Sequence, residues 1–263
     1  MIVHTRRIEY QSGQEIRIKA LADVHYGSTA CDVRGFKKFL DEDPEAYFIG
    51  NGDLLNSIVT SDIKRYRKSD DATPSDAIID DQIQGMYEML KPYRERIICL
   101  GTGNHEDAIT KYHGTNPMQR LCELLQVPFV GYSWLLRILL SSNGGAGRCV
   151  IIRGHHGWGG GSRTQGADLT KYSKDVAYWD ADVFMYGHVH RLQSDRVPRL
   201  GLSGERLISK PKIMILCGSW LKTYSGNNNP TYSEQKGYPP IEMGGATLKI
   251  KPTYKWVDMR VDL

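Results

Sequence analysis

Carboxylate and imidazole side chains gather in short motifs along this chain. Asp23 and His25 stand one residue apart, and Gly52 is followed by Asp53. Carboxylate oxygens and imidazole nitrogens are both good ligands for divalent metals of borderline hardness. A carboxylate such as Asp53 can also bind a different ion with each of its oxygens. Each motif alone is weak evidence, because Asp-x-His and Gly-Asp also occur in ordinary turns.

The segment at residues 101–106, Gly-Thr-Gly-Asn-His-Glu, is the strongest single motif. Its two glycines allow the backbone to turn tightly and to approach other groups closely. Asn104 offers a neutral amide oxygen to a metal, and His105 is suited to protonate a leaving group. A glycine-rich turn with an Asn cap would not explain why a histidine and a glutamate follow.

Two further motifs carry paired histidines. His155 and His156 open a glycine-rich segment, and His188 and His190 flank a single valine. A His-x-His pair in an extended segment places both imidazoles on the same side, which suits two adjacent metal ligands.

Each of these motifs follows an apolar run of strand length. The runs cover residues 16–21, 46–49, 97–100, 150–152 and 183–186. Loops that leave the carboxyl ends of strands in an α/β sheet converge on one crevice. The sequence therefore predicts a layered α/β protein whose polar site lies at the carboxyl edge of its sheets.

Helical patterns separate several of these runs. We expect helices over residues 33–40, 75–90, 116–125 and 169–179. In the second, apolar residues form one stripe at helical spacing, which we interpret as core packing, and Pro92 ends the pattern. After His190 the pattern becomes strand-like, with strands expected over residues 213–216, 246–250 and 254–257 and a polar loop over residues 223–245.

Composition narrows the class of protein. The 263 residues are 40% hydrophobic and carry a formal net charge of +4, so the chain can bury a core and is not disordered. This charge is too small to imply nucleic-acid binding by itself. Five scattered cysteines, no signal-peptide pattern and no apolar run of about 18 residues lead us to expect a cytoplasmic protein without a membrane span. No linker divides the chain, so we expect a single domain over residues 1–263.

Taken in order, the motifs resemble those of the calcineurin-like metallophosphoesterase family. The resemblance covers about residues 17–220 and is specific as a set. It implies a four-layer α-β-β-α sandwich with a binuclear metal centre at the carboxyl edge of its sheets. It also implies metal-dependent hydrolysis of phosphoesters.

The resemblance implies a ligand set, carried over residue by residue. Asp23, His25 and His190 would bind the first ion. Asp53 would bridge the two ions.

The second ion would be bound by Asn104, His188 and one of two neighbouring histidines. His155 resembles the Gly-His element that follows a strand in this family, so we expect His155 to be the ligand. His156 is the alternative, because the family also shows a histidine followed directly by glycine.

The implied mechanism uses metal-activated hydroxide. Two divalent ions about 3.5–4 Å apart would lower the pKa of a shared water toward about 7 and hold the phosphoryl oxygens for in-line attack. His105 would protonate the leaving oxygen or stabilise its developing charge. Nitrogen and oxygen ligands without thiolate favour Mn, Fe, Zn, Co or Ni over Mg alone. The family often works with Mn, so we expect Mn(II).

Candidate substrate-binding residues follow the paired histidines. Arg163 and the glycine-rich backbone before it are suited to approach a phosphate, and Trp158 to stack on a base. A flexible surface loop with one buried Trp is an equal alternative. Tyr224, Tyr232 and Tyr238 would either wall a nucleotide cleft or pack internally.

The leading functional hypothesis is a phosphodiesterase that acts on nucleic acid or nucleotides. A phosphomonoesterase, acting on proteins or small molecules, is the first alternative. A non-enzymatic scaffold that keeps its metals is the second, and the unbroken motif set argues against it.

Overall fold

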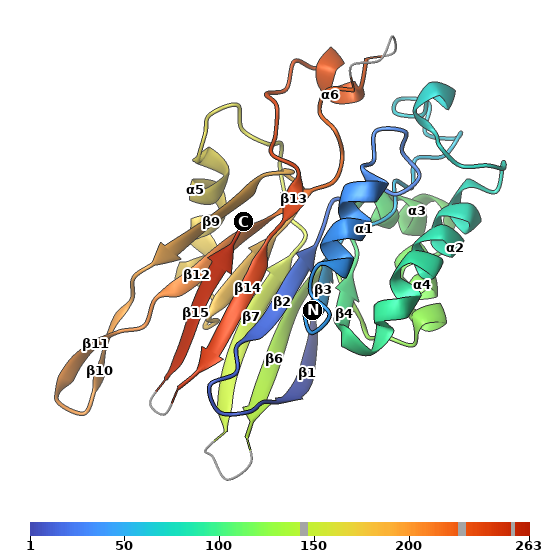
Figure 1. Ribbon diagram of the computed structural model, residues 1–263. Helices are drawn as coiled ribbons and strands as arrows, with labels where there is room; N and C mark the ends of the chain where they lie inside the picture. Colours follow the sequence, from blue (N-terminus) through green and yellow to red (C-terminus); the bar gives the residue numbers. More distant parts are fainter. Residues whose placement is uncertain (143–146, 226–229, 254–255) are drawn as a thin grey trace.

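Four layers make up this protein, as the computed structural model shows for residues 1–142, 147–225, 230–253 and 256–263 (Figure 1). Two β-sheets lie face to face between two layers of helices. The helices over one outer face are α1 (Val33–Asp41), α2 (Ile78–Leu90), α3 (Asn104–His113) and α4 (Pro117–Leu125). The other outer face carries α5 (Ala167–Ser173). The expected α-β-β-α sandwich is confirmed.

The six-stranded sheet supplies the first three motifs. Its strands, in spatial order, are β15 (Val257–Asp262), β14 (Thr247–Pro252), β2 (Ile16–Leu21), β3 (Tyr47–Asn51), β4 (Ile97–Gly101) and β5 (Phe129–Gly131). Strands β2 to β5 run parallel to one another, so their carboxyl ends share one edge of the sheet.

The seven-stranded sheet supplies the paired histidines. Its strands are β1 (Ile2–Glu9), β6 (Ser133–Ser141), β7 (Arg148–His155), β8 (Val183–Tyr186), β12 (Lys212–Ser219) and β13 (Gly244–Gly245), with β9 (Leu192–Val197) also paired to β12. Strands β7, β8 and β12 are parallel. A separate hairpin is formed by β10 (Leu200–Ser203) and β11 (Arg206–Ser209).

Alternating side chains join the layers. In β3, Phe48 packs toward the helices whereas Ile49 packs between the sheets. In β8, Met185 packs between the sheets whereas Phe184 faces the α5 side. This period of two is what a strand buried on both faces requires, and it holds both sheets rigidly at the edge where the motifs emerge.

Element boundaries agree closely with the expected ones in the core. Strands over residues 16–21 and 183–186 begin and end as expected. The helix expected from residue 75 begins at Ile78, and Ser75 lies before it with its backbone N–H donating to the Asp81 carboxylate. The helix expected over residues 169–179 is divided into α5 and a short 3-10 helix, η3 (Lys174–Ala177).

The C-terminal third differs more from expectation. The strand expected over residues 254–257 falls partly on residues 254 and 255, which lie outside the described residues, and β15 begins at Val257. The loop expected over residues 223–245 contains α6 (Tyr232–Gln235) and β13, while residues 226–229 lie outside the described part.

Two further 3-10 helices, η1 (Lys68–Asp70) and η2 (Lys91–Arg96), flank α2. Among the described helices, none is both long and apolar enough to span a membrane.

Candidate metal centre

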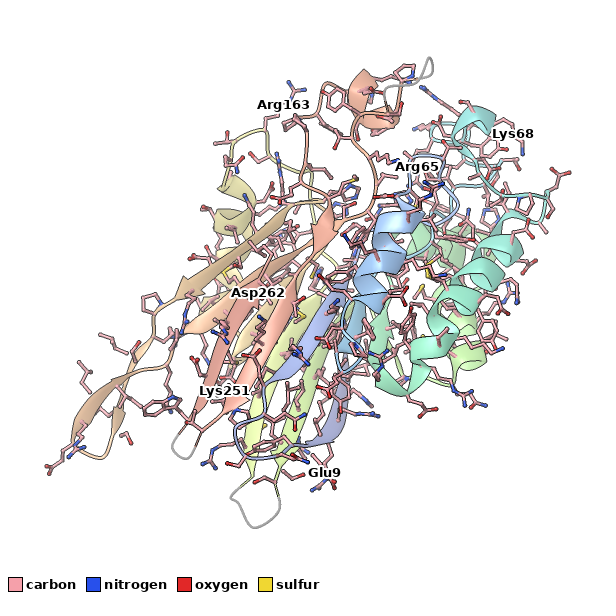
Figure 2. All side chains as sticks on the ribbon, viewed as in Figure 1. Glu9, Arg65, Lys68, Arg163, Lys251 and Asp262 are labelled. Atoms are coloured by element: carbon pink, nitrogen blue, oxygen red, sulfur yellow. The ribbon has the colours of Figure 1, made fainter. Side chains whose placement is uncertain are left out.

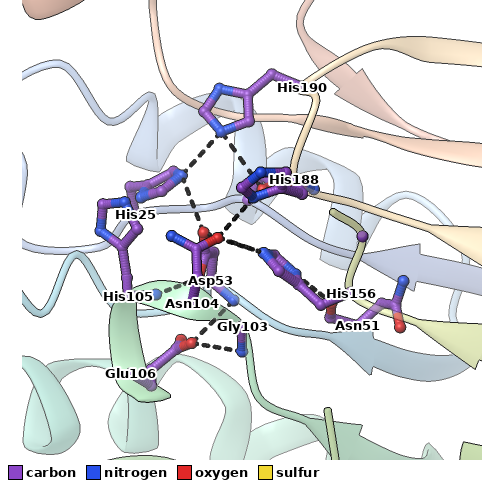
Figure 3. Close-up of polar contacts among 12 residues, drawn as sticks. His25, Asn51, Asp53, Gly103, Asn104, His105, Glu106, His156, His188 and His190 are labelled. Carbon is purple, nitrogen blue, oxygen red and sulfur yellow. Dashed lines mark hydrogen bonds and ion pairs between the residues drawn. The ribbon is translucent and has the colours of Figure 1, made fainter. Parts of the chain in front are cut away.

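The motifs of both sheets meet at one edge of the molecule (Figure 3). Strands β2, β3 and β4 end just before Asp23, Asp53 and Asn104, respectively. Strands β7 and β8 end at or just before the paired histidines of the other sheet. Segments far apart in the sequence thereby bring carboxylate, amide and imidazole groups together.

The backbone is strained at this edge. Seven non-glycine residues of the described chain have positive φ, and five of them belong to the motifs: Asp23, His25, Asp53, His188 and His190. Such angles are uncommon outside glycine and cluster at functional sites. Hydrogen bonds compensate for them, since the backbone N–H groups of Asp23 and His25 donate to the carbonyls of Gly52 and Asp53 at 3.1 and 3.0 Å. The turns direct the side chains toward one point.

One group of ligating atoms consists of Asp23, His25 and His190, all within 4.8 Å of one another. The Nε2 atoms of His25 and His190 are 3.1 Å apart, and His190 Nε2 lies 3.4 Å from Asp23 Oδ1. Asp23 and His25 are fully buried. Two imidazole nitrogens and a carboxylate oxygen directed at one another form a geometry suited to a shared cation.

A second group consists of Asp53, His156 and His188, again within 4.8 Å. His156 Nε2 is 3.2 Å from Asp53 Oδ2 and 3.1 Å from Asn104 Oδ1. The Asn104 oxygen is also 2.6 Å from His188 Nδ1. Asn104 therefore joins this group with a neutral oxygen.

Asp53 connects the two groups. Its Oδ2 lies 3.2 Å from His156 Nε2 and 4.0 Å from His25 Nε2. Burial alone would raise the pKa of the Asp53 carboxyl, but His156 and His105 outweigh burial and hold this pKa well below its usual range. Burial lowers the pKa of His156, but the Asp53 charge prevails and raises it to about 10.

These electrostatics fit a metal site. The buried charge of Asp53 favours a cationic neighbour, and His156 Nε2 lies 3.2 Å from its Oδ2. A divalent cation would supply positive charge there with the imidazole neutral, as ligation requires. Carboxylate, amide and imidazole donors without thiolate are a set that divalent transition metals accept.

The choice between the two adjacent histidines goes to His156, not to the favoured His155. Strand β7 continues through His155, so successive side chains point to opposite sides. His156 points into the second group, while His155 Nδ1 accepts the Gly157 N–H at 2.9 Å and its ring packs edge-on against Trp158. The second donor group of the structure thus contains His156 and not the expected His155.

Carbonyl groups fix the orientation of two imidazoles. His156 Nδ1 lies 2.8 Å from the Asn51 carbonyl, and His105 Nδ1 lies 2.6 Å from the Asn56 carbonyl. An Nδ1–H donor in each ring leaves Nε2 as the free nitrogen. For His156 this nitrogen faces Asp53 and Asn104.

His105 lies beside both groups. Its backbone N–H donates to Asp53 Oδ1 at 2.9 Å, and its ring is edge-on to His25 with centroids 4.6 Å apart. Burial lowers its pKa more than Asp53 and the Asn56 carbonyl raise it. His105 also forms a close triplet with His25 and Asp53, so a ligand role and a proton-transfer role must be separated by experiment.

Glu106 is a structural residue to which the sequence assigned no role. Its fully buried carboxylate accepts backbone N–H groups from Asp53, Leu55 and Gly103 at 3.0, 3.0 and 2.8 Å. Burial and the Asp53 charge raise its pKa to about 8, against the Leu55 and Gly103 hydrogen bonds. Its position as third residue of α3, where a capping carboxylate belongs, was the available signal.

The expected substrate residues lie on the loop after His156. Trp158 is partly exposed and packs edge-on against Tyr172 and Tyr186, so it serves partly as core. Arg163 is exposed, and its Nη2 donates to the Lys236 carbonyl at 3.2 Å. Neither belongs to the ligand groups.

Comparison with known proteins gives one family. A family model for calcineurin-like phosphoesterases matches residues 16–192. A search of curated proteins found no match.

Similar solved structures share little sequence. Vacuolar protein sorting 29 from Cryptosporidium parvum is 14% identical, with 94% of this chain and 97% of that chain covered and a TM-score of 0.38. A conserved uncharacterized protein of Streptococcus pneumoniae, described as a predicted phosphoesterase, is 12% identical, with coverages of 95% and 99% and a TM-score of 0.32. A metallophosphoesterase from Sphaerobacter thermophilus is 12% identical, with coverages of 94% and 89% and a TM-score of 0.37.

Proposed function

Because this chain belongs to the calcineurin-like phosphoesterase family, we propose that it is a binuclear-metal phosphodiesterase acting on nucleic acid or nucleotides. Asp23, His25 and His190 would hold the first ion. The second would be held by Asn104, His156 and His188. Asp53 would be shared by the two.

The observation that carries the proposal is the position of Asp53 between two complete donor groups. Asp53 Oδ2 lies 4.0 Å from His25 Nε2 of one group and 3.2 Å from His156 Nε2 of the other, and each group contains ligands from both sheets. A structural ion pair would need one partner, not two converging sets. The arrangement therefore supports two ions more strongly than one.

The chain's own residues have distinct tasks in the reaction. Bound divalent cations supply Lewis acidity, which acidifies water and neutralises charge on the phosphoryl oxygens. The Asn51 carbonyl orients His156, and the Glu106 carboxylate holds the turn that carries Asp53. His105 would act as an imidazolium, with Nδ1–H donating to the Asn56 carbonyl and the Nε2 proton passing to the leaving oxygen, which leaves a neutral ring.

A direct assay tests the function. Protein stripped with chelator and reloaded with Mn²⁺, Zn²⁺ or Co²⁺ is tested on bis-p-nitrophenyl phosphate and on p-nitrophenyl phosphate. We expect metal-dependent turnover with a higher kcat/KM on the diester. Faster turnover of the monoester would assign a phosphomonoesterase instead, and no turnover of either by protein shown to hold two ions would support a non-enzymatic scaffold.

A further inference from the structure

The segment between β12 and β13 begins beside the metal centre, and its far end pairs back onto β12. Residues 218 and 219 of β12 pair with 245 and 244 of β13, which closes the excursion of residues 223–243. At its start, Ser219 Oγ and the Trp220 N–H donate to the Asp23 carbonyl at 2.8 and 3.1 Å. The excursion therefore starts next to Asp23, and Figure 1 shows its helix α6 beyond β13.

Three tyrosines on this excursion remain largely exposed. Tyr224, Tyr232 and Tyr238 are 50%, 52% and 42% exposed, which does not fit internal packing. Tyr224 Oη donates to the Tyr238 carbonyl at 2.8 Å, and the Tyr232 and Tyr238 rings lie 6.3 Å apart. The rings are thus held together by the protein while a large part of each faces solvent.

The short helix α6 fixes the tyrosines in place. Thr231 caps it, since its Oγ1 accepts the Glu234 N–H at 3.1 Å and the Glu234 carboxylate accepts the Thr231 N–H. The excursion has two acidic residues within residues 223–243. The Glu234 carboxylate takes part in this helix cap, whereas Glu242 is exposed.

Two basic side chains, Lys236 and Arg163, lie on or contact the segment that carries the tyrosine rings. Lys236 Nζ lies 5.6 Å from the centroid of the Tyr232 ring. Arg163 reaches across from the loop after His156 and donates to the Lys236 carbonyl at 3.2 Å. Figure 2 shows Arg163 beside α6, at the same end of the molecule as Arg65 and Lys68 and opposite Glu9 and Lys251.

The loop that carries Arg163 is continuous with the metal centre. The Arg191 guanidinium, next to His190, donates to the Ser162 carbonyl at 3.1 Å. A side-chain carbon at Gly161 would lie 3.6 Å from the Val189 carbonyl oxygen, between the two His ligands. The loop of Arg163 therefore contacts the segment that carries His188 and His190, and Arg163 links that loop to the tyrosine segment through the Lys236 carbonyl.

We propose that Tyr224, Tyr232 and Tyr238, together with Arg163 and Lys236, form a docking platform for single-stranded nucleic acid. The inference rests on the proposed function, because the bound strand would present its phosphodiesters to the metal centre. Aromatic faces stack on any unpaired base, and neighbouring cations contact the phosphates. A duplex keeps its bases stacked internally, so it gains little from exposed rings.

Binding without turnover tests the platform separately from catalysis. The Kd of a fluorescein-labelled 12-nucleotide DNA strand, and of the RNA of the same sequence, is measured by fluorescence anisotropy in EDTA. We expect the Tyr232→Ala/Tyr238→Ala double variant to bind the preferred strand at least about tenfold more weakly than wild type. A matched control is Tyr112→Ala, because Tyr112 is also exposed beside a lysine, with Lys111 Nζ 5.0 Å from its ring centroid.

Two further arms sharpen the test. Arg163→Ala should reduce the slope of log K against log salt by about 0.7, as expected for one lost phosphate contact to a single strand. Turnover of bis-p-nitrophenyl phosphate should stay within about twofold of wild type in the tyrosine double variant, because that substrate is too small to need the platform.

The outcomes separate the two proposals. Unchanged affinity in the double variant, equal loss in Tyr112→Ala, or duplex binding as tight as single-strand binding would overturn the platform. No diester turnover by metal-loaded wild type, with the tyrosine effect on strand binding intact, would overturn the proposed function and leave the platform standing.

Discussion

The two sheets contribute different chemistry to the candidate metal centre. The six-stranded sheet supplies both carboxylates, Asp23 and Asp53, whereas the seven-stranded sheet supplies only imidazoles, from His156, His188 and His190. Negative charge thus belongs to the six-stranded sheet, which also supplies the neutral donors His25 and Asn104, whereas the other sheet supplies imidazoles alone. We therefore expect that cation affinity depends mainly on the carboxylates of the first sheet, and that the second sheet contributes imidazoles that complete each group.

Protein contacts already join the sheets at this edge. The His188 N–H donates to Asp23 Oδ2 at 2.9 Å. The Asn51 amide donates to the carbonyls of His155 and Met185 at 3.1 and 3.3 Å. These hydrogen bonds connect the two sheets at the site without any contribution from a bound cation.

Removing charge from the first sheet should have the largest effect. We expect Asp53→Asn to lower kcat/KM for bis-p-nitrophenyl phosphate by about 10³-fold or more and to reduce the metal content, because the carboxylate shared by both groups is lost. Metal analysis by mass spectrometry, together with initial rates, checks this. Two retained ions per chain with normal rates would show that Asp53 is not a bridge.

Removing a neutral donor from the second sheet should have a smaller effect. We expect His156→Gln to lower kcat/KM by about 10²-fold and to weaken binding of one ion, because the charge of Asp53 remains. The matched control is His155→Gln, which alters the adjacent residue outside the ligand groups and should lower the rate less than tenfold. The reverse order would return the ligand role to His155.

A variant of His105 tests whether every imidazole near Asp53 is a metal ligand. We expect His105→Ala to lower kcat by about 10²-fold with two ions still bound, since a proton donor contributes to the rate but not to metal affinity. The loss should be smaller for substrates with a good leaving group, such as p-nitrophenolate, than for an alkyl diester. An ion lost together with the side chain would make His105 a ligand.

Asn51→Ala tests the junction of the sheets with the smallest expected effect. The fully buried Asn51 amide contacts two strands of the opposite sheet, so its removal should lower the free energy of unfolding by about 1–3 kcal/mol. Urea unfolding in EDTA measures this. Saturating Mn²⁺ should recover part of the loss, because bound ions join the same two sheets. An unchanged midpoint would show that Asn51 does not connect them.

Much of the site was predictable because its residues follow apolar runs. Asp23 and Asp53 each come two residues after the end of a buried strand, and parallel neighbouring strands end at one edge of the sheet. The structure brings the expected residues together, with His156 in place of His155. That choice depends on where β7 ends, and the apolar run at 150–152 stops three residues short of the observed end.

Other features lacked a pattern that sequence can reveal. Helix α3 was not expected, because its sequence is polar and Ile109 is the main apolar side chain that it buries. Strand β6 contains Leu135 and Leu139 as well as the buried Leu136 and Leu140, so its near-continuous apolar run does not distinguish a strand from a helix. The exposure of the tyrosines on the excursion follows from tertiary contacts alone.

Anomalous diffraction from crystals soaked in Mn²⁺ tests the central claim most directly. The account predicts two anomalous peaks about 3.5–4 Å apart, one on each side of the Asp53 carboxylate. The first would be contacted by Asp23, His25 and His190, and the second by Asn104, His156 and His188. Saturating Mn²⁺ that gives no peak beside Asp53, or a single peak bound by only one of these groups, would contradict it.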